Sequence, residues 1–255
     1  MKYVRIQLND KVSYGIVEEE KVIEINGNPI FENCKETGET YNLSEVKILS
    51  PNPSPPKNLC LALNYGSHLL GANAPKKPEP FYKTVTAICG PGDPIKIPKD
   101  AGLVACESEL VVIIGKEAKN VSENNALDYV FGYTCGNDVS AREWQSGNNS
   151  DMQWWRAKSC DTFGPTGPFI VTDIDPQNVS IRGLVNGVEG QKCHSSEMIF
   201  SVSESISFIS KYVTLVPGDM LWTGTSGMTP PINPGDDVTV EIDKVGTLIN
   251  PVEAA

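Results

Sequence analysis

The sequence contains little histidine, no long apolar run and no excess of positive charge. Its formal net charge is −11 at pH 7, and only two of its 255 residues are histidines. This charge argues against a nucleic acid or an anionic membrane as partner. No apolar run is long enough to span a bilayer, and residues 1–8 lack the apolar core of a signal peptide. We therefore expect a cytoplasmic protein.

The cysteine pattern agrees with that expectation. The seven cysteines are odd in number and scattered along the chain, and no two of them have the C-x-x-C spacing. Because no secretory signal precedes them, we expect them to be reduced thiols.

Closely spaced prolines divide the chain in two. Residues 51–57 are the expected linker, because prolines at such spacing cannot continue a helix or a central strand. The preceding residues 1–50 predict a small N-terminal β domain, and residues 58–255 remain for a larger domain that holds every candidate catalytic group. The short strands expected in the first part cover residues 3–8, 12–18 and 22–25.

The larger domain is predicted to be of mixed α/β class, rich in strands and poor in helices. Residues 122–130 predict a helix that Ser122 can cap, and residues 202–213 predict a second one. A helix or lid is expected to begin within residues 64–70, and residues 191–196 indicate a polar turn. The expected strands are 59–63, 95–98, 110–115, 169–171, 179–186, 220–223 and 238–242.

Two glutamates stand at the start of the most apolar of these strands. The run 110–115 is continuous enough to predict a strand buried on both faces. Since residues i and i+2 of a strand share a face, roughly 6–7 Å apart, Glu107 and Glu109 would point the same way. A helix beginning near Asp138 would place that residue, Arg142 and Gln145 on one face.

Three carboxylates that converge on one point would repel one another. At about 4 Å and an effective dielectric constant near 20, each pair costs roughly 4 kcal/mol. A hard divalent cation such as magnesium, manganese or calcium offsets that cost. Alternatively, Glu107 and Glu109 are solvated residues at the end of a strand, and Asp138 pairs with Arg142 on a helix surface.

His68 and Lys158 are the other candidate reactive groups. His68 follows an apolar strand, and an imidazole with a pKa near 6.5 can take a proton at neutral pH. It can equally be structural or merely exposed. The second histidine, His194, lies in the expected polar turn and indicates a surface loop. An isolated lysine such as Lys158 is ordinarily a solvated surface charge.

Five stretches of the larger domain form a pattern with a definite order and spacing. They are Leu63-Asn64-Tyr65-Gly66-Ser67-His68, Glu107-Ser108-Glu109-Leu110, Gly132-Tyr133-Thr134 with Asn137-Asp138-Val139-Ser140-Ala141-Arg142, Ala157-Lys158-Ser159-Cys160-Asp161-Thr162-Phe163-Gly164-Pro165, and Gly218-Asp219 with Thr223-Gly224-Thr225. In these stretches the chain resembles the fumarylacetoacetate hydrolase family, from about Asn58 to Pro251. The resemblance is specific for the family but not for a substrate.

The resemblance implies a fold, a metal and roles for particular residues. The fold would consist of rolled mixed sheets with few helices, and the protein would be a homodimer. Glu107, Glu109 and Asp138 would bind Mg²⁺ or Mn²⁺, with Ca²⁺ also compatible. His68 and Lys158 would be catalytic, with Lys158 reaching the substrate. The substrate-binding residues would be Arg142, Gln145, Thr225 and Tyr65.

The chain departs from the family pattern at two places. Many relatives have a glutamate three residues after the histidine, where it orients the ring and helps to activate water; Gly71 stands there instead. Residues 226–231, Ser-Gly-Met-Thr-Pro-Pro, replace a commoner Pro-Lys-Gly-Val-Gly loop that borders the pocket. Hydrolysis by a His–Glu dyad is therefore in doubt, and the substrate can differ in shape.

The resemblance predicts a divalent-metal-dependent enzyme that acts on a 2-oxo or 1,3-dioxo carboxylic acid. The first expectation is C–C bond cleavage, as in acylpyruvate hydrolysis or oxaloacetate decarboxylation. The alternatives are keto–enol tautomerisation, double-bond isomerisation, and a tailoring reaction on a cyclic diketone. Decarboxylation, tautomerisation and isomerisation need no activated water, so Gly71 favours those three reactions. A non-catalytic metal-binding protein is a further alternative from another functional class.

Overall fold

Strands dominate the computed structural model, which describes residues 1–69 and 71–255. The α-helices are α1 (Arg142–Gln145), α2 (Trp155–Ser159) and α3 (Val202–Tyr212), and short 3-10 helices cover Leu43–Glu45, Gly66–His68, Val85–Ala87, Glu123–Tyr129 and Ser195–Glu197. The strands are β1 (Lys2–Leu8), β2 (Lys11–Glu18), β3 (Lys21–Ile25), β4 (Glu36–Asn42), β5 (Lys47–Leu49), β6 (Asn58–Leu61), β7 (Pro80–Tyr82), β8 (Ile88–Cys89), β9 (Ile95–Ile97), β10 (Val104–Ala105), β11 (Ser108–Ile114), β12 (Val130–Asn137), β13 (Ser140–Ala141), β14 (Gly164–Val171), β15 (Ser180–Val185), β16 (Val188–His194), β17 (Met220–Trp222), β18 (Asp237–Ile242) and β19 (Gly246–Ala254).

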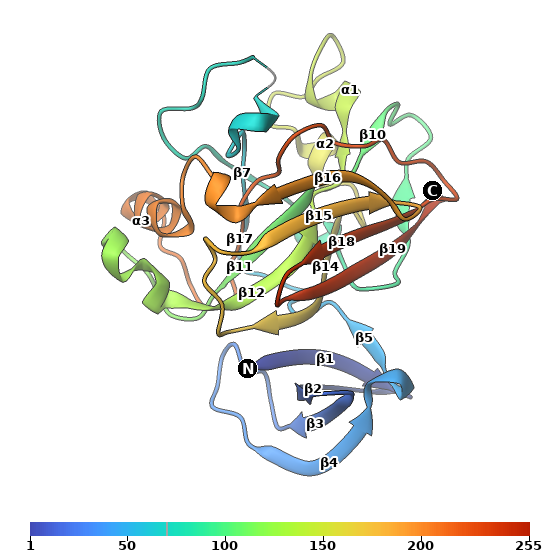
Figure 1. Ribbon diagram of the computed structural model, residues 1–255, viewed down its shortest axis with the longest axis vertical. Helices are drawn as coiled ribbons and strands as arrows, with labels where there is room; N and C mark the ends of the chain where they lie inside the picture. Colours follow the sequence, from blue (N-terminus) through green and yellow to red (C-terminus); the bar gives the residue numbers. More distant parts are fainter. Residues whose placement is uncertain (70) are drawn as a thin grey trace.

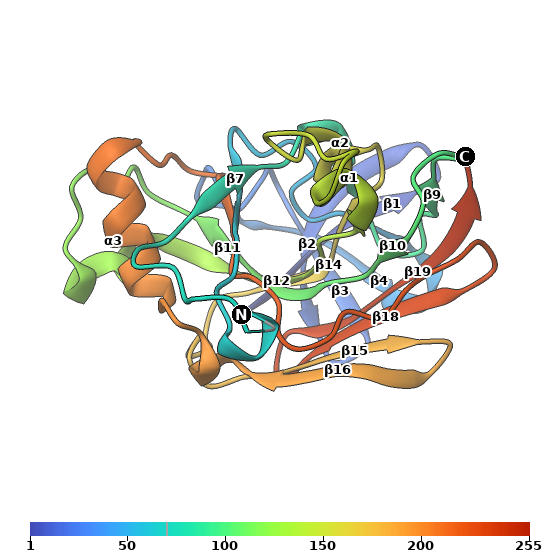
Figure 2. The ribbon, with the colours of Figure 1, turned by 90° about the horizontal axis from the view of Figure 1, so that it is seen from above.

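Most strands belong to two sheets. A 12-stranded sheet has the order β4-β3-β2-β1-β14-β12-β11-β17-β6-β7, with β5 beside β1 and β8 beside β14. A five-stranded sheet has the order β16-β15-β18-β19-β9, and β10 pairs with β13. The five-stranded sheet lies along one side of β11, β12 and β14, and α1 and α2 lie on the other side (Figures 1 and 2). This layered, strand-rich arrangement confirms the predicted fold class.

Strand β11 is buried on both faces, as its apolar sequence predicts. Leu110, Val112 and Ile114 pack into the main core with residues of the five-stranded sheet and α3. Val111 and Ile113 face the opposite way, into a second cluster with Met220 and Trp222. Neighbouring strands pair with both edges of β11, β12 on one side and β17 on the other. Because the strand is fixed on every side, it holds the residues at its start rigidly.

Helix α3 confirms the prediction for residues 202–213. The Ser201 side chain accepts a hydrogen bond from the backbone N–H of Glu204, whose carboxylate accepts one from the backbone of Ser201. This reciprocal capping box satisfies backbone donors that the first turn would otherwise leave free. Val202, Ile206 and Ile209 then recur on one face and pack into the main core.

The N-terminal strands join the large sheet. Strands β1 to β4 lie together at one end of the molecule (Figure 1). They have a small core of their own in Val4, Ile6 and Val22. Strand β1 also pairs with β14 at two positions, for example Tyr3 with Ile170. The proline-rich segment 51–57 packs against the rest of the chain, because the Asn52 side chain donates a hydrogen bond of 2.7 Å to the Gly218 carbonyl.

The helix expected to begin near Asp138 begins four residues later. Strand β12 runs to Asn137, and Ser140 and Ala141 pair with β10. Helix α1 begins at Arg142 and spans one turn. The prediction was wrong because pairing with a strand some 35 residues earlier in the chain holds this segment extended.

Three other local predictions need correction. The segment expected to be helical over 122–130 is a 3-10 helix over Glu123–Tyr129, and the Ser122 side chain makes no capping hydrogen bond. The expected helix or lid over 64–70 is a single 3-10 turn at Gly66–His68, with Leu70 outside the described residues. The expected polar turn at 191–196 is largely β16, an edge strand whose alternating burial suits polar residues.

Two further observations bear on the expectations from composition. Within residues 1–69 and 71–255, no helix is long and apolar enough to cross a membrane. All seven cysteines are free thiols.

Candidate active site

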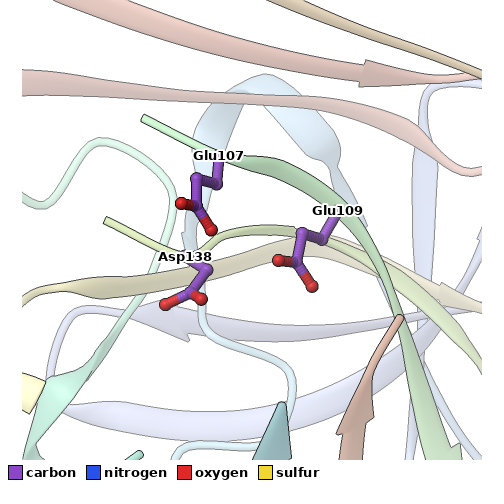
Figure 3. A group of neighbouring side chains, drawn as sticks. All are labelled: Glu107, Glu109 and Asp138. Atoms are coloured by element: carbon purple, nitrogen blue, oxygen red, sulfur yellow. The ribbon is translucent and has the colours of Figure 1, made fainter. Parts of the chain in front are cut away.

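Three carboxylates meet where two paired strands end. Glu107 precedes β11, Glu109 lies within it, and Asp138 follows β12. The two strands are antiparallel and in register, and the Asp138 N–H donates to the Glu107 carbonyl at 2.9 Å. One oxygen from each carboxylate lies within 4.8 Å of the others, and the three side chains are close neighbours (Figure 3). All three are buried.

Glu107 and Asp138 are each paired with two side-chain cations. Lys158 Nζ lies 2.7 Å from Glu107 Oε2 and 2.7 Å from Asp138 Oδ2, and so bridges the two carboxylates. Arg142 lies 2.7 Å from Glu107 Oε1, and Lys83 Nζ lies 2.7 Å from Asp138 Oδ1. The predicted pairing of Asp138 with Arg142 on a helix surface is therefore wrong, because Arg142 pairs with Glu107.

This pairing fixes the charge of the lysine and of one carboxylate. Burial alone would raise the pKa of Glu107, but Lys158 and Arg142 outweigh it and lower that pKa to about 2. Burial alone would lower the pKa of Lys158, but Asp138 and Glu107 raise it above its ordinary value. Lys158 is thus a permanent cation at neutral pH and is not a surface lysine.

Glu109 is the carboxylate that the side-chain cations neutralise least. Its Oε2 accepts a hydrogen bond of 2.8 Å from the backbone N–H of Gly224. Burial, followed by the charges of Asp138 and Glu107, raises the pKa of Glu109 well above its ordinary value. A divalent cation would reverse that effect, because it stabilises the ionised form. Three carboxylates with hard oxygen donors thus suit Mg²⁺ or Mn²⁺.

Lys83 is a site residue that the sequence did not reveal. It follows the short strand β7, is 3% exposed, and donates hydrogen bonds to the carbonyls of Lys158 and Phe163 besides contacting Asp138. A lysine after three strand residues carries no distinguishing spacing, and its partners lie 55 to 80 positions later. No sequence signal could have found it.

His68 lines the same small cavity as the three carboxylates. Its Nδ1 lies 2.7 Å from the Gly227 carbonyl oxygen, which belongs to the loop that departs from the family pattern. Gly71 is exposed and has open space where a side chain would begin, while Glu79 pairs with Lys77 at 3.7 Å. Among the described residues, no carboxylate forms an ion pair with His68.

The cavity brings together most, but not all, of the predicted site residues. Gln145 and Thr225 line it, and Gln145 accepts a hydrogen bond of 2.7 Å from Arg142. Tyr65 does not line it, because its side chain is fully buried in the main apolar core. His194 caps the turn after β16, where its ring contacts Ser196. The cavity measures about 30 Å³ and is lined by Leu61, Ala62, Leu63, His68, Phe81, Glu107, Glu109, Asp138, Gln145, Trp154, Lys158 and Thr225.

Comparison with known protein families identifies the group to which this site belongs. Residues 57–253 match the family model described as fumarylacetoacetate (FAA) hydrolase C-terminal. The chain belongs to the fumarylacetoacetate hydrolase family. Its first 51 residues match a second model, described as Rv2993c-like, N-terminal.

Several similar proteins in this fumarylacetoacetate hydrolase family are named as enzymes. The mitochondrial oxaloacetate tautomerase fahd2 of Xenopus laevis is 43% identical over 221 residues, which cover 82% of this chain and 69% of that protein. The solved structure of 5-carboxymethyl-2-hydroxymuconate delta-isomerase from Mycobacterium smegmatis is 39% identical, with a TM-score of 0.92 and complete coverage of both chains. Maleylpyruvate hydrolase from Sphingobium sp. SYK-6, solved with manganese(II) and pyruvate, is 27% identical with a TM-score of 0.83, again with complete coverage of both.

These fumarylacetoacetate hydrolase family members span different reactions on a shared fold. One named relative is a tautomerase, one an isomerase and one a hydrolase. The manganese in the hydrolase structure belongs to that protein. In the present chain the buried acidic triad is a possible metal site of suitable composition.

Proposed function

We propose that this family member is a divalent-cation-dependent enzyme that interconverts the keto and enol forms of a small 2-oxo dicarboxylic acid of the oxaloacetate type. One observation carries the proposal: the Lys158 ammonium lies 2.7 Å from two of three buried carboxylates, in the cavity that His68 also lines. This arrangement would supply a cation site, a fixed positive charge and a proton carrier in one cavity.

Glu107, Glu109 and Asp138 would hold the cation. When bound, a divalent cation supplies Lewis acidity that draws electron density from the oxygens of a keto acid. Arg142 and Lys83 hold Glu107 and Asp138 from the outside, so that these carboxylates keep their positions.

Lys158 supplies a positive charge where negative charge develops. Because its pKa is raised, it stays protonated and does not act as the base. Its ammonium would stabilise the enolate oxygen that forms when the carbon beside the keto group loses a proton. The group is buried and already fixed by two carboxylates, so little reorganisation is needed.

His68 would carry the proton. In enolisation its ring nitrogen takes a proton from the carbon beside the keto group, and the C–H electron pair becomes part of the C=C bond. The carbonyl π pair moves onto the oxygen, which then receives the proton that His68 had taken. In ketonisation these transfers reverse. No water is consumed in either direction, so the reaction does not require the glutamate that Gly71 replaces.

The remaining polar groups suit a small anionic substrate. Thr225 and Gln145 line the cavity, and Arg142 pairs with Glu107, which also lines it. Hydroxyl, amide and guanidinium donors of this kind bind a carboxylate.

The second candidate function is C–C bond cleavage of a similar substrate, first of all oxaloacetate decarboxylation. Decarboxylation leaves the same kind of enolate, which the buried Lys158 ammonium would stabilise equally well. Acylpyruvate hydrolysis is less favoured, because His68 has a neutral carbonyl partner instead of a carboxylate. A non-catalytic metal-binding role is least favoured, because the lysine and all three candidate ligands are present.

The decisive experiment follows the loss of ultraviolet absorbance by enol-oxaloacetate with Mg²⁺ or Mn²⁺, while a coupled assay measures pyruvate. We expect rapid ketonisation with little pyruvate, and about a 100- to 1,000-fold loss of kcat in Lys158→Met. Lys192→Met, which removes an exposed lysine on β16, is the matched control. Pyruvate formation as fast as ketonisation would favour decarboxylation, and no metal-dependent activity on either form would refute the proposal.

We also propose that the partner is a small keto acid and not a nucleic acid or a membrane, in keeping with the net charge of −11. The family resemblance suggests a homodimer. Light scattering coupled to size-exclusion chromatography would test this: the monomer mass of 27.7 kDa would argue against the dimer.

A further inference from the structure

The loop that departs from the family pattern, residues 226–231, forms hydrogen bonds with the segment that carries His68. The His68 ring contacts the Gly227 carbonyl oxygen through Nδ1 at 2.7 Å. The backbone N–H of the same glycine donates a hydrogen bond of 3.1 Å to the Ser67 hydroxyl. The backbone N–H and the carbonyl of Gly227 thus contact two consecutive side chains, Ser67 and His68, of the 3-10 turn Gly66–His68.

Gly227 can play this part because its backbone is held in an unusual conformation. Its φ is +61°, in the left-handed region that glycine adopts without strain. On one side, the Ser226 carbonyl accepts a hydrogen bond of 2.8 Å from Gln191. On the other, the Thr229 hydroxyl accepts one from Arg142, which also binds Glu107. The carbonyl is therefore a fixed acceptor.

We propose that the Gly227 carbonyl, steadied by Ser67, holds neutral His68 in the tautomer with the proton on Nδ1. A carbonyl oxygen can only accept, so the Nδ1 atom beside it must carry the proton. Nε2 then keeps its lone pair as the basic nitrogen that serves the cavity. Ser67 and Gly227 are positioning residues, and the role of Nε2 as base rests on the proposed function.

This arrangement differs chemically from a histidine–carboxylate pair. A carboxylate both orients the ring and stabilises the imidazolium, whereas a carbonyl orients the ring without adding a negative charge. The carbonyl therefore fixes the orientation and the tautomer of the ring without forming an ion pair with it. That property suits a residue that takes a proton from one atom of a substrate and soon returns it to the substrate.

The second histidine provides an internal reference of opposite polarity. The His194 Nδ1 accepts a hydrogen bond of 3.3 Å from the Ser196 backbone N–H. The Ser196 hydroxyl, 2.7 Å from the same Nδ1, can also donate to it. We therefore expect the neutral ring to carry its proton on Nε2. One protein thus contains both tautomers, and they can be observed in the same sample.

Nitrogen NMR of the full chain labelled with ring-¹⁵N histidine tests the tautomer directly, well above the ordinary imidazole pKa of about 6.5. The His194→Gln variant assigns the His68 signals. We expect a protonated Nδ1 and an unprotonated Nε2 for His68, with the reverse for His194. A protonated Nε2 at His68, or averaged shifts like those of free histidine, would overturn the proposal.

The role of the hydrogen bond between Ser67 and Gly227 is tested by Ser67→Ala, with Ser67→Thr as the conservative variant. Loss of one neutral hydrogen bond should lower kcat roughly five-fold and leave KM nearly unchanged, while the His68 shifts move toward averaged values. Threonine keeps the hydroxyl at this exposed position and should restore both readouts. Unchanged shifts and kcat in Ser67→Ala would refute the role of Ser67.

The tautomer measurement needs no substrate, so the two proposals can fail separately. Nδ1 protonation at His68 in a protein without activity on keto acids would refute the proposed function and leave the inference intact. Nε2 protonation in an active enzyme would do the opposite.

Discussion

Lys83 and Asp138 form an ion pair in the interior, with Lys83 Nζ 2.7 Å from Asp138 Oδ1 and the two side chains at most 1% exposed. The lysine also donates hydrogen bonds to the Lys158 and Phe163 carbonyls. It therefore links a candidate metal ligand to the backbone that carries the candidate catalytic lysine. The cationic side of this site thus comprises two lysines and Arg142.

Replacing Lys83 with methionine should destabilise the protein strongly. The change leaves Asp138 buried with one fewer cation and removes one donor from each of the Lys158 and Phe163 carbonyls, for which about 3–5 kcal/mol is expected. Urea denaturation measures the loss. Lys47→Met breaks a more exposed pair with Asp93 and should cost no more than about 1 kcal/mol. Equal stability of the two variants would contradict a structural role for Lys83.

Divalent metal should bind at the acidic triad and depend on Glu109. In Glu109→Gln we expect the Mn²⁺ affinity, measured by calorimetry, to fall by more than about 10-fold. Changes to residues that only support a metal ligand already cost about 10-fold, and Glu109 would be a ligand itself. In the wild type, saturating Mn²⁺ should raise the melting temperature, and a chelator should reverse the rise. Glu117→Gln alters an exposed carboxylate beyond β11 and should leave the affinity unchanged. An unaltered affinity in Glu109→Gln would remove this residue from the metal site.

The Thr225 hydroxyl should affect substrate binding more than turnover. It is buried beside the cavity, donates to the Ser108 carbonyl at 3.1 Å and accepts from Gln191 at 2.9 Å. When substrate binds, the hydroxyl would turn its single proton from the Ser108 carbonyl to the substrate carboxylate. Thr225→Val should therefore raise KM roughly 5- to 10-fold, the effect of one hydrogen bond, and change kcat less. Thr225→Ser retains the hydroxyl and should restore KM. A selective loss of kcat would instead assign Thr225 to the chemical step.

Acid should weaken the N-terminal strands through Glu24. Burial alone would raise the pKa of Glu24, but hydrogen bonding with Lys11 at 2.6 Å, together with Ser13 and Thr37, lowers it. A carboxyl whose folded pKa is depressed stabilises the fold above its unfolded value, near 4.3, and loses that contribution as pH falls through the folded pKa.

The Glu24→Gln variant should therefore be less stable than the wild type at pH 7, and its stability should decline less below about pH 4.3. Urea denaturation across this range measures both effects. Glu39→Gln, at an exposed position of β4, should follow the wild-type curve. If Glu24→Gln lost stability with acid as steeply as the wild type, another carboxyl would be responsible.

The sequence was sufficient where the information is local or repeated in motifs. The apolar run after Glu109 predicts a strand buried on both faces, because successive side chains of a strand point to opposite sides. The i, i+2 spacing predicts that Glu107 and Glu109 share a face, and the structure brings them together with Asp138. The family followed from several motifs in the correct order, and the comparison confirmed it.

Tertiary structure alone decided the partners of these residues. The segment after Asp138 is extended because it pairs with β10, which overrides its helical pattern. Lys83 enters the site through contacts made 55 to 80 positions along the chain, and Gly227 reaches His68 across 159 positions. Such contacts depend on how strands are ordered in a sheet and where loops end, and no local spacing encodes them. The reactive groups could be predicted from the sequence. The charged and hydrogen-bonding partners that determine their protonation and orientation follow only from the tertiary structure.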